Sequence, residues 1–494
     1  MQESVIMRRI AIAFLAACSL VAVAAPSSLQ AQIFMSPDEA KKLGQQEHPK
    51  ILKEFGGVYD DPEIGAYVAG IAGRIAGQSG QPAGNFTFTV LNAPIVNAFA
   101  LPGGYVYITR GTLALANNEA EAAGVLGHEI GHVIAQHSEK RYDKSVFTNL
   151  GVAGASILGS IFLGSGAGDL IGQVGQVGGG AYLASFSREN ELEADTIGVK
   201  LLSRVGYAPD AQAGFLQSMS NYSDLAGKMA GAAGKDRMND LFATHPGGPQ
   251  RVREAIAAAR EQPVANPVYR RDEFLDRLDG MIYGDDPKEG VVRGNSFTHP
   301  DLRLSFTVPD GWRLSNTSDA VLAIGTGGRL QFDIEGDKKK VQASRNALDY
   351  LTRIWLPNLR LGNAEAIKVN GMPAATASGR LQMKSGNAEV RFIAVGFPTD
   401  DILRFVIIAP VGGLSKIEPA LIRSINTLRH LSEAEAKAVK PVRLKVVKVD
   451  SGDTVESLAG KTPLGRYAAE QLRVMNALQG NEQPRPGERF KTVE

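Results

Sequence analysis

The stretch from Gly127 to His132, an HExxH motif, constrains this chain more than any other feature. His128 and His132 stand four residues apart, so on a helix both side chains project from one face and can share a metal ion. Two imidazoles suit Zn²⁺ and leave room for a third protein ligand and a water. Bound zinc lowers the pKa of that water to about 7, and Glu129 can take its proton as the water attacks a carbonyl. A chance pair of core histidines would give the same five residues, so the motif needs support from the rest of the chain.

With 494 residues, the chain is too long for one ordinary hydrophobic core, and two to four domains are expected. Its 44% hydrophobic residues, 21% charged residues and net charge of +1 are typical of a globular protein. No basic excess or Lys/Arg run points to nucleic acid, so a nucleic-acid partner is not expected.

The first 31 residues predict an export signal. A basic start at 7–9 is followed by an almost wholly apolar run between Ile10 and Ala25, and cleavage is expected after Ala31. A permanent membrane anchor is the weaker interpretation, because the apolar run is under about 18 residues. Cys18, the only cysteine, follows a lipobox-like sequence, so it could instead become a lipidated N-terminus. The predicted location is a bacterial periplasm, which a mature chain without disulfides suits.

Secondary-structure signals precede the HExxH motif. Ser36 and Pro37 predict a helix start, and a second helix is expected over 62–78. Residues 86–91 alternate as a strand, and 97–109 predict two short strands around a Pro-Gly-Gly turn. An ordinary hairpin is the simplest interpretation of 97–109. The alternative is an open edge strand that pairs with an extended peptide.

The HExxH helix itself has a clear start, with Asn118 as its cap and Glu121 three residues later. The helix is apolar nearly all round, so it should be buried. Gly124, Gly127 and Gly131 cost roughly 1 kcal/mol each against alanine inside a helix. Three such glycines indicate that another backbone packs very close.

Two nearby features have competing interpretations. A metzincin would place a glycine at 135 and a third histidine ligand at 138, where this chain has Ala135 and Ser138. His137 is therefore interpreted as a helix-end residue rather than a ligand. Residues 147–184, rich in Gly and Ala, predict a mobile helical flap or a buried hairpin in preference to a transmembrane helix.

Glu191 and Asp195 are candidates to complete the metal site. They stand four apart, on one face of an expected helix about 60 residues after the histidines. Glu191 can be the third zinc ligand, and Asp195 can orient a ligand imidazole by accepting its free N–H. Alone, the pair would be interpreted as a solvated acidic face. Together with HExxH it supplies the ligand that two histidines need.

Four motifs resemble metallopeptidase family forty-eight, which includes HtpX, the CAAX prenyl endopeptidase and BepA. The matching pieces are residues 97–104, 128–132, 191–195 and 244–246. The resemblance implies a mainly helical, zincin-like (gluzincin) peptidase domain with a small sheet. It also implies one Zn²⁺ per chain, held by His128, His132 and Glu191, with Glu129 as the base.

The same resemblance implies that the hairpin after Asn97 borders the substrate cleft. The candidate substrate-binding residues are Asn97, Phe99, Gly103, Gly104 and Tyr105. The histidine that matches His245 can occupy the open zinc position or assist catalysis, although on sequence alone this residue begins a simple turn. The chain departs from HtpX and the prenyl endopeptidase in lacking a convincing membrane span. It departs from BepA in lacking a 34-residue helical repeat.

The fold class expected is α+β and multidomain. The expected segments are a signal peptide (1–31), a peptidase domain (32–265), a charged linker (266–290), an α+β domain with a largely antiparallel sheet (291–432) and a small βααβ module (443–494). A helix over 251–260 should face inward through Val252, Ile256 and Ala257. Residues 309–312 weakly resemble PsbP-like or Mog1-like domains.

Three stretches, at 449–455, 472–476 and 485–489, match a pattern typical of LysM modules, so residues 443–494 resemble such a module. That resemblance implies binding of glycans that contain N-acetylglucosamine, such as peptidoglycan. The alternative is a degenerate copy that only packs on its neighbour.

These features together predict an exported zinc endopeptidase that hydrolyses envelope proteins, with a role in outer-membrane protein quality control suggested by the family. Its expected partners are protein or peptide substrates, peptidoglycan through the C-terminal module, and the outer membrane. One alternative is a cell-wall-associated chaperone or scaffold whose protease site is blocked by His245. Another alternative is a peptidoglycan hydrolase.

Overall fold

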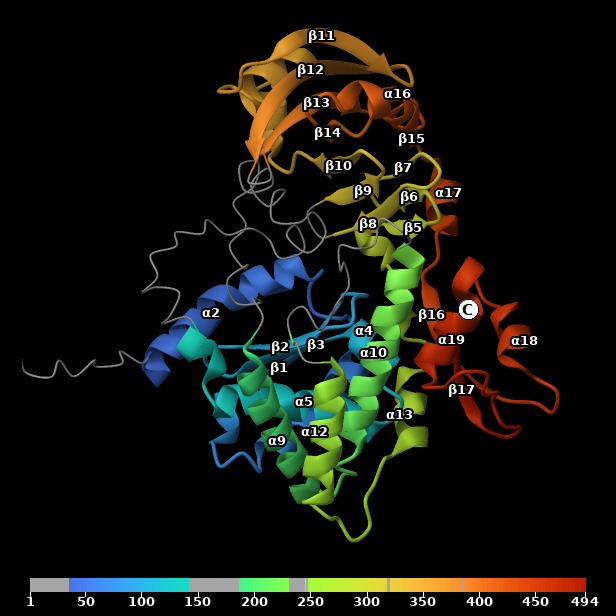
Figure 1. The fold of residues 1–494 in the computed structure, drawn as a ribbon. Coiled ribbons are helices and arrows are strands. Elements are labelled where there is room, and N and C mark those ends of the chain that lie inside the picture. Colours follow the sequence, from blue (N-terminus) through green and yellow to red (C-terminus); the bar gives the residue numbers. More distant parts are fainter. Residues whose placement is uncertain (1–34, 142–185, 231–244, 246–247, 318–319, 384–385) are drawn as a thin grey trace, which may run out of the picture.

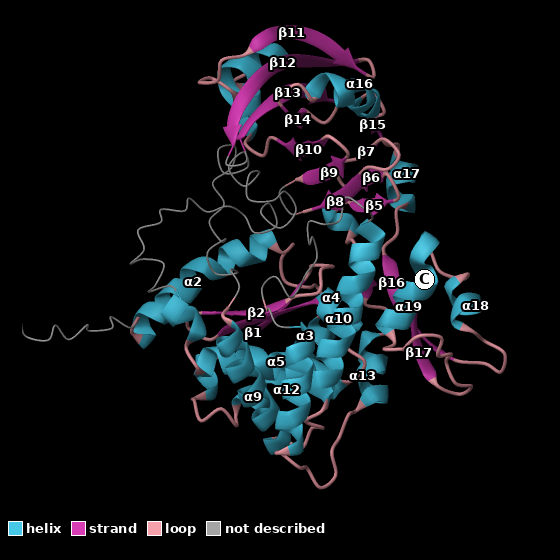
Figure 2. Cartoon of the chain, in the orientation of Figure 1, coloured by secondary structure: helices cyan, strands magenta, loops and turns pink. Residues whose placement is uncertain are grey.

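The computed structural model describes residues 35–141, 186–230, 245, 248–317, 320–383 and 386–494 (Figure 1). The expected signal peptide with Cys18 and the Gly-rich segment 147–184 lie outside these residues. Within the described part, helical and strand-rich regions are separate, as Figure 2 shows. The predicted α+β, multidomain class is confirmed.

A mainly helical region surrounds a three-stranded sheet. Its elements are α2 (Pro37–Glu54), α3 (Pro62–Ala76), β1 (Thr87–Leu91), β2 (Ala98–Leu101), β3 (Tyr105–Thr109), α4 (Arg110–Leu115), α5 (Glu119–Ile134), α9 (Arg188–Arg204), α10 (Ala211–Ala230) and α12 (Gly248–Arg260). The predicted helix starts are confirmed: Ser36 and Glu39 form a capping box, and the Asn118 side chain accepts the Glu121 N–H.

The predicted hairpin is confirmed. β2 pairs antiparallel with β3, β3 pairs parallel with β1, and β2 is the edge strand of the order β1-β3-β2. Gly103 and Gly104 form the turn, with φ of +80° and +81°. A Cβ on Gly104 would overlap the carbonyl oxygen of Asn85, so this turn admits no side chain there.

The α5 helix is buried along most of its length, and its glycines meet other backbones as expected. A Cβ on Gly124 would lie 3.1 Å from the Gln212 Cα, and one on Gly131 would lie 2.8 Å from the Ala194 carbonyl oxygen. Gly127 faces Gly198 of α9. The glycines therefore let α9 and α10 approach the helix that carries the two motif histidines.

The segment 266–290, predicted to be a linker, is folded. It contains α13 (Arg271–Leu278), with Phe274, Leu275 and Leu278 buried, and β4 (Ile282–Tyr283). It does connect the helical region to the strand-rich region, but through packed elements. Charged residues are frequent in this segment, but its buried apolar side chains, which also include Met281, pack into the core of the helical region.

The strand-rich region has the antiparallel sheets that were predicted. Among the described residues, one sheet has the order β11-β12-β13-β14-β10-β9-β8 and the other β15-β7-β6-β5. The strands are β5 (Val291–Arg293), β6 (Ser296–His299), β7 (Leu304–Thr307), β8 (Arg313–Asn316), β9 (Val321–Gly325), β10 (Gly328–Ile334), β11 (Gly362–Val369), β12 (Met372–Met383), β13 (Gly386–Phe397), β14 (Asp401–Pro410) and β15 (Arg429–His430).

Helices cover these sheets and lead out of them. They are α14 (Lys338–Gln342), α15 (Ala347–Asp349), the π-helical turn η4 (Tyr350–Trp355), α16 (Leu414–Ile425) and α17 (Glu433–Ala438). Asn346 caps the start of α15, which continues directly into η4.

The C-terminal segment runs β16 (Val442–Lys448), α18 (Val455–Ala459), α19 (Ala468–Met475) and β17 (Arg489–Val493), the expected order βααβ. It shares one hydrophobic core with the helical region, and β16 pairs with β4 as well as with β17. The Lys491 ammonium, fully buried, donates to the carbonyls of Ala114 (2.8 Å), Leu115 (3.3 Å) and Ala116 (2.6 Å). The C-terminal segment is thus fixed to the end of α4.

None of the helices in the described ranges combines the length and the apolar character that a bilayer crossing requires.

Replacing the buried ammonium tests this attachment. Lys491→Met keeps the apolar stem but leaves three carbonyls without their donor and the buried Glu121 without its neighbouring cation. We expect a loss of about 3 kcal/mol in unfolding free energy, measured by urea denaturation. The control Lys445→Met, at a side chain that is 41% exposed, should change it by less than about 0.5 kcal/mol. Equal losses in both variants would contradict the proposed anchor.

Candidate metal centre

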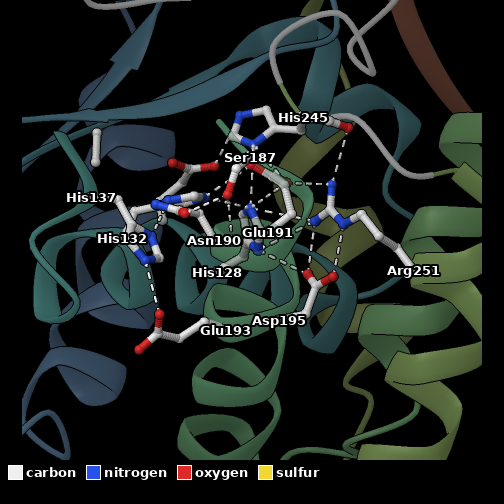
Figure 3. A network of polar contacts seen from close by, with 12 residues as sticks. His128, His132, His137, Ser187, Asn190, Glu191, Glu193, Asp195, His245 and Arg251 are labelled. Atoms are coloured by element: carbon white, nitrogen blue, oxygen red, sulfur yellow. Dashed lines mark hydrogen bonds and ion pairs between the residues drawn. The ribbon is translucent and has the colours of Figure 1, made fainter. Parts of the chain in front are cut away.

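Three elements bring the candidate ligands together (Figure 3). The α5 helix presents His128, Glu129 and His132, and α9 presents Glu191 and Asp195. Ser187 caps α9 by accepting the Asn190 N–H at its hydroxyl oxygen, and Glu191 lies in the first turn of that helix. His245 lies three residues before α12 and enters from the opposite side of the site.

The ligand atoms of His128, His132, Glu191 and His245 all lie within 4.8 Å of one another. His128 Nε2 is 3.0 Å from His132 Nε2 and 3.3 Å from His245 Nδ1. Glu191 Oε1 is 3.1 Å from His245 Nδ1 and 3.5 Å from His132 Nε2. Zn–N bonds of 2.0–2.1 Å in a tetrahedron place neighbouring donors about 3.3 Å apart, so these spacings fit one zinc ion.

The hydrogen bonds made by Nδ1 of His128 and of His132 determine which ring nitrogen of each histidine carries a lone pair. His128 Nδ1 lies 2.9 Å from Asp195 Oδ1, and a carboxylate can only accept there. His132 Nδ1 lies 2.9 Å from His137 Nδ1, and His137 Nε2 lies 3.2 Å from Glu193 Oε2. In both histidines Nδ1 therefore carries the hydrogen, which it donates to Asp195 in one case and to His137 in the other. Each Nε2 is then unprotonated, and the lone pairs of these two atoms face each other. A cation between them removes that repulsion, so the residues present fit a bound metal.

Glu129 lies beside this cluster and is only 1% exposed. Its Oε1 is 3.7 Å from His245 Nε2, and its Oε2 has no hydrogen-bond partner among the described residues. Burial raises the pKa of Glu129, while His245 and His128 act against that rise. An unpartnered buried carboxylate oxygen at a metal cluster suits an acceptor for a proton from water.

Arg251 is the main residue that the sequence analysis missed. Its Nε and Nη2 each lie 2.7 Å from an oxygen of Asp195, and its Nη1 lies 2.8 Å from Glu191 Oε2. Burial favours the neutral carboxyl of Asp195, but Arg251 outweighs it and keeps the pKa of Asp195 well below its usual range. The sequence did contain a signal for such a residue, because it places three acidic residues, Glu129, Glu191 and Asp195, at one buried site. Burying three carboxylates together requires a cationic side chain nearby.

The inward face predicted for the last helix of this region is only partly right, because Val252 packs against the core but Ile256 and Ala257 do not. On α12, Arg251 and Ala255 are the buried residues, whereas Ile256 is 39% exposed and Ala257 is exposed. The apolar pattern pointed to Ile256, but the ion pairs with α9 rotate Arg251 toward the metal cluster instead.

His137, interpreted as a helix-end residue, lies outside the four-donor cluster but contacts the back of His132. Its ring therefore fixes the tautomer of a candidate ligand, which is the function of an outer hydrogen-bond partner. The spacing of five residues from His132, just past the end of α5 at Ile134, is the signal in the sequence.

The residues of the β2–β3 hairpin differ in how close they lie to the metal cluster. Ala98, not singled out from the sequence, has its carbonyl oxygen 3.3 Å from His245 Nε2. Asn97 is buried, and its carbonyl accepts from Thr109 and Thr112. Phe99 faces away from the metal cluster and stacks on Tyr107, because alternate residues of a strand point to opposite faces. Gly103, Gly104 and Tyr105 pack near α2 or β1, and the structure does not bring them to the cluster.

Comparisons with known proteins match part of this chain, and the family match includes the cluster. Residues 58–259 match the model described as Peptidase family M48. The Beta-barrel assembly-enhancing protease of Yersinia pestis is 30% identical over 46% of this chain and 45% of its own length. The Mitochondrial metalloendopeptidase OMA1 of Schizosaccharomyces pombe is 30% identical over 44% of this chain and 61% of its own. The chain thus spans about half the length of the curated relatives it matches.

Similarity to solved structures is weak. A cyanobacterial PsbP from Synechocystis covers 28% of the chain at 13% identity and a TM-score of 0.23, too low to support an argument.

Removing the buried guanidinium tests its part in the metal site. Arg251→Met should lower zinc affinity by about 10–100-fold, because Asp195 and Glu191 lose the donors that orient them. Zinc content after dialysis against a competing chelator measures the change. Arg253, exposed on the same helix, provides the matched control Arg253→Met. Unchanged zinc retention in a folded Arg251→Met would contradict this prediction.

Proposed function

We propose that this chain is an exported zinc endopeptidase that hydrolyses proteins of the bacterial envelope, a proposal supported by the match of residues 58–259 to the Peptidase family M48 model. The observation that carries the proposal is the buried cluster of His128, His132, Glu191 and His245, with Glu129 beside it. The Yersinia relative, named a beta-barrel assembly-enhancing protease, supports an envelope substrate and a role in quality control. The apolar run before Ala31 supports export to the periplasm.

In this proposal His128, His132 and Glu191 hold one zinc ion, and Asp195 holds the ring of His128 in place. Zinc, when bound, polarises a substrate carbonyl and lowers the pKa of a coordinated water to about 7. Glu129 accepts a proton from the attacking water and passes it to the leaving amine as the peptide C–N bond breaks. The edge strand β2 offers its backbone to an extended peptide, beside the Ala98 carbonyl.

The position of His245 supports a self-inhibited form of this enzyme. Its Nδ1 is as near to Glu191 and His128 as the other candidate ligands are to each other. A zinc ion with four protein donors is a closed site, whereas a catalytic zinc keeps one position open. We infer that His245 must leave the cluster before substrate is cleaved.

The C-terminal segment would anchor the peptidase to glycan. Its βααβ order supports the proposed LysM-like identity, and its shared core with the helical region would keep the metal centre close to peptidoglycan. Association with the outer membrane is a further part of the proposal, and lipid attachment at Cys18 is the alternative to cleavage after Ala31. Radiolabelled palmitate incorporation that is lost in Cys18→Ala would establish the lipid.

Substituting the base separates catalysis from metal binding. Glu129→Gln should keep one zinc per chain and lose at least about 1000-fold in cleavage of an unfolded protein, because no group remains to take the proton. The fully exposed Glu189, at the start of α9, gives the control Glu189→Gln. Peptide products and released glycan from purified sacculi are measured together. Glycan release that depends on Glu129, without peptide products, would identify a peptidoglycan hydrolase instead.

Removing the fourth donor tests the closed state. His245→Ala should raise kcat/KM by about tenfold or more if the closed form holds nine-tenths of the molecules, with zinc still bound. A histidine remote from the site provides the control His299→Ala. A fall in kcat/KM would show that His245 assists catalysis. Zinc-loaded wild type and His245→Ala that both lack cleavage would favour the scaffold or chaperone alternative.

A further inference from the structure

A cavity of about 440 Å³ lies between the helical region and the C-terminal segment, away from the metal cluster. Its walls come from α4, the second half of α10, β4 and α19, and Figure 1 shows these helices close together. The lining is mainly apolar and includes Val96, Leu115, Tyr222, Leu225, Ile282 and Val474. This volume is within the range of small-molecule sites, and most of these groups belong to a shared interior.

Arg110, the first residue of α4, lines this cavity although it is only 1% exposed. Its Nε donates to Asn92 Oδ1 (2.7 Å) and its Nη1 donates to the Ile282 carbonyl (2.8 Å). Its Nη2 is buried and has no hydrogen-bond partner within the described ranges. A buried cationic donor left without an acceptor is costly, so an anionic ligand atom in the cavity would complete the arginine's hydrogen bonds.

The neighbouring carboxylates do not neutralise this guanidinium by direct contact. Asp286 accepts from Asn92 Nδ2 and Asp285 accepts from the Val292 N–H, and neither is in an ion pair with Arg110 among the described residues. Burial raises the pKa of Asp285, while the Val292 N–H and the charge of Arg110 act against that rise. Arg313 adds a second guanidinium to the cavity wall. The cavity therefore combines apolar walls with one buried guanidinium nitrogen, Arg110 Nη2, that has no acceptor among the described residues.

We propose that this cavity binds an aliphatic chain that ends in a carboxylate, with the carboxylate on Arg110 Nη2 and the chain between α10 and α19. Both a fatty acid and the apolar C-terminus of a peptide offer this chemistry. The walls come from the helical region and the C-terminal segment together, so a bound ligand would join the two. The site shares no residue with the metal cluster and does not depend on the proposed peptidase activity.

Ligand titrations of the full chain test the proposal. Dodecanoate is compared with dodecanol by calorimetry, and a short apolar peptide with a free C-terminus is compared with its amide. We expect the carboxylate form of the true ligand class to bind at least about tenfold more tightly than its neutral partner. Preference for dodecanoate identifies a fatty acid, and preference for the free peptide identifies a peptide terminus. Failure of both carboxylates to bind, or equal binding of charged and neutral forms in both pairs, would overturn the proposal.

Two variants locate the binding. Ala226→Phe fills the cavity from α10 and should abolish binding, whereas Lys228→Ala, exposed on the same helix and outside the lining, should keep it. Arg110→Gln should remove the preference for the carboxylate, although it also loses structural hydrogen bonds. The Ala226→Phe result does not depend on Arg110, so it decides the location if Arg110→Gln fails to fold. Binding that survives Ala226→Phe would place the ligand elsewhere and refute the assignment.

Discussion

The rest of the metal centre depends on the ion pair between Arg251 and Asp195. The two-point contact joins α12 to α9, and Asp195 in turn holds the His128 ring of α5. Three nearly inaccessible carboxylates, Glu129, Glu191 and Asp195, meet there. Arg251 with a divalent ion would balance their three negative charges. Burial of such a set is possible only when charges are matched, which explains why distant segments converge on one point.

The glycines of α5 make that convergence possible. Gly127 and Gly131 let the backbone of α9 come within van der Waals distance of α5. A glutamate on α9 can therefore share a metal site with the two histidines of α5. The cost in helix propensity is roughly 1 kcal/mol for each glycine. The glycines thus lower the helix propensity of α5 but allow the close contact between α5 and α9 on which the metal centre depends.

The C-terminal segment is not packed as a separate domain. Its sequence resembles an independent module, but its core is continuous with that of the helical region, and Lys491 is buried against α4. The segment 266–290, which looks like a charged linker, contributes Phe274 and β4 to the same junction. Movement of the C-terminal segment relative to the metal centre would therefore require separation of a packed core.

Local patterns in the sequence determined much of this protein. Caps at Ser36 and Asn118, the Pro-Gly-Gly turn and alternating strands predict elements that the structure contains, because each depends on neighbours a few residues apart. The spacing of four within HExxH and within ExxxD likewise places both pairs on helix faces.

Only the tertiary structure decided which partners meet across the chain. Arg251 has no local signal that separates it from the exposed Arg253, yet the carboxylates of α9 select it for burial. The side chain of Phe99 turns away from the cluster although its motif borders it, because strand pairing fixes which residues face α5. The junction cavity and the enclosed Lys491 depend on segments more than 350 residues apart. Contacts of that range arise from packing and charge matching, and no pattern of neighbouring residues encodes them.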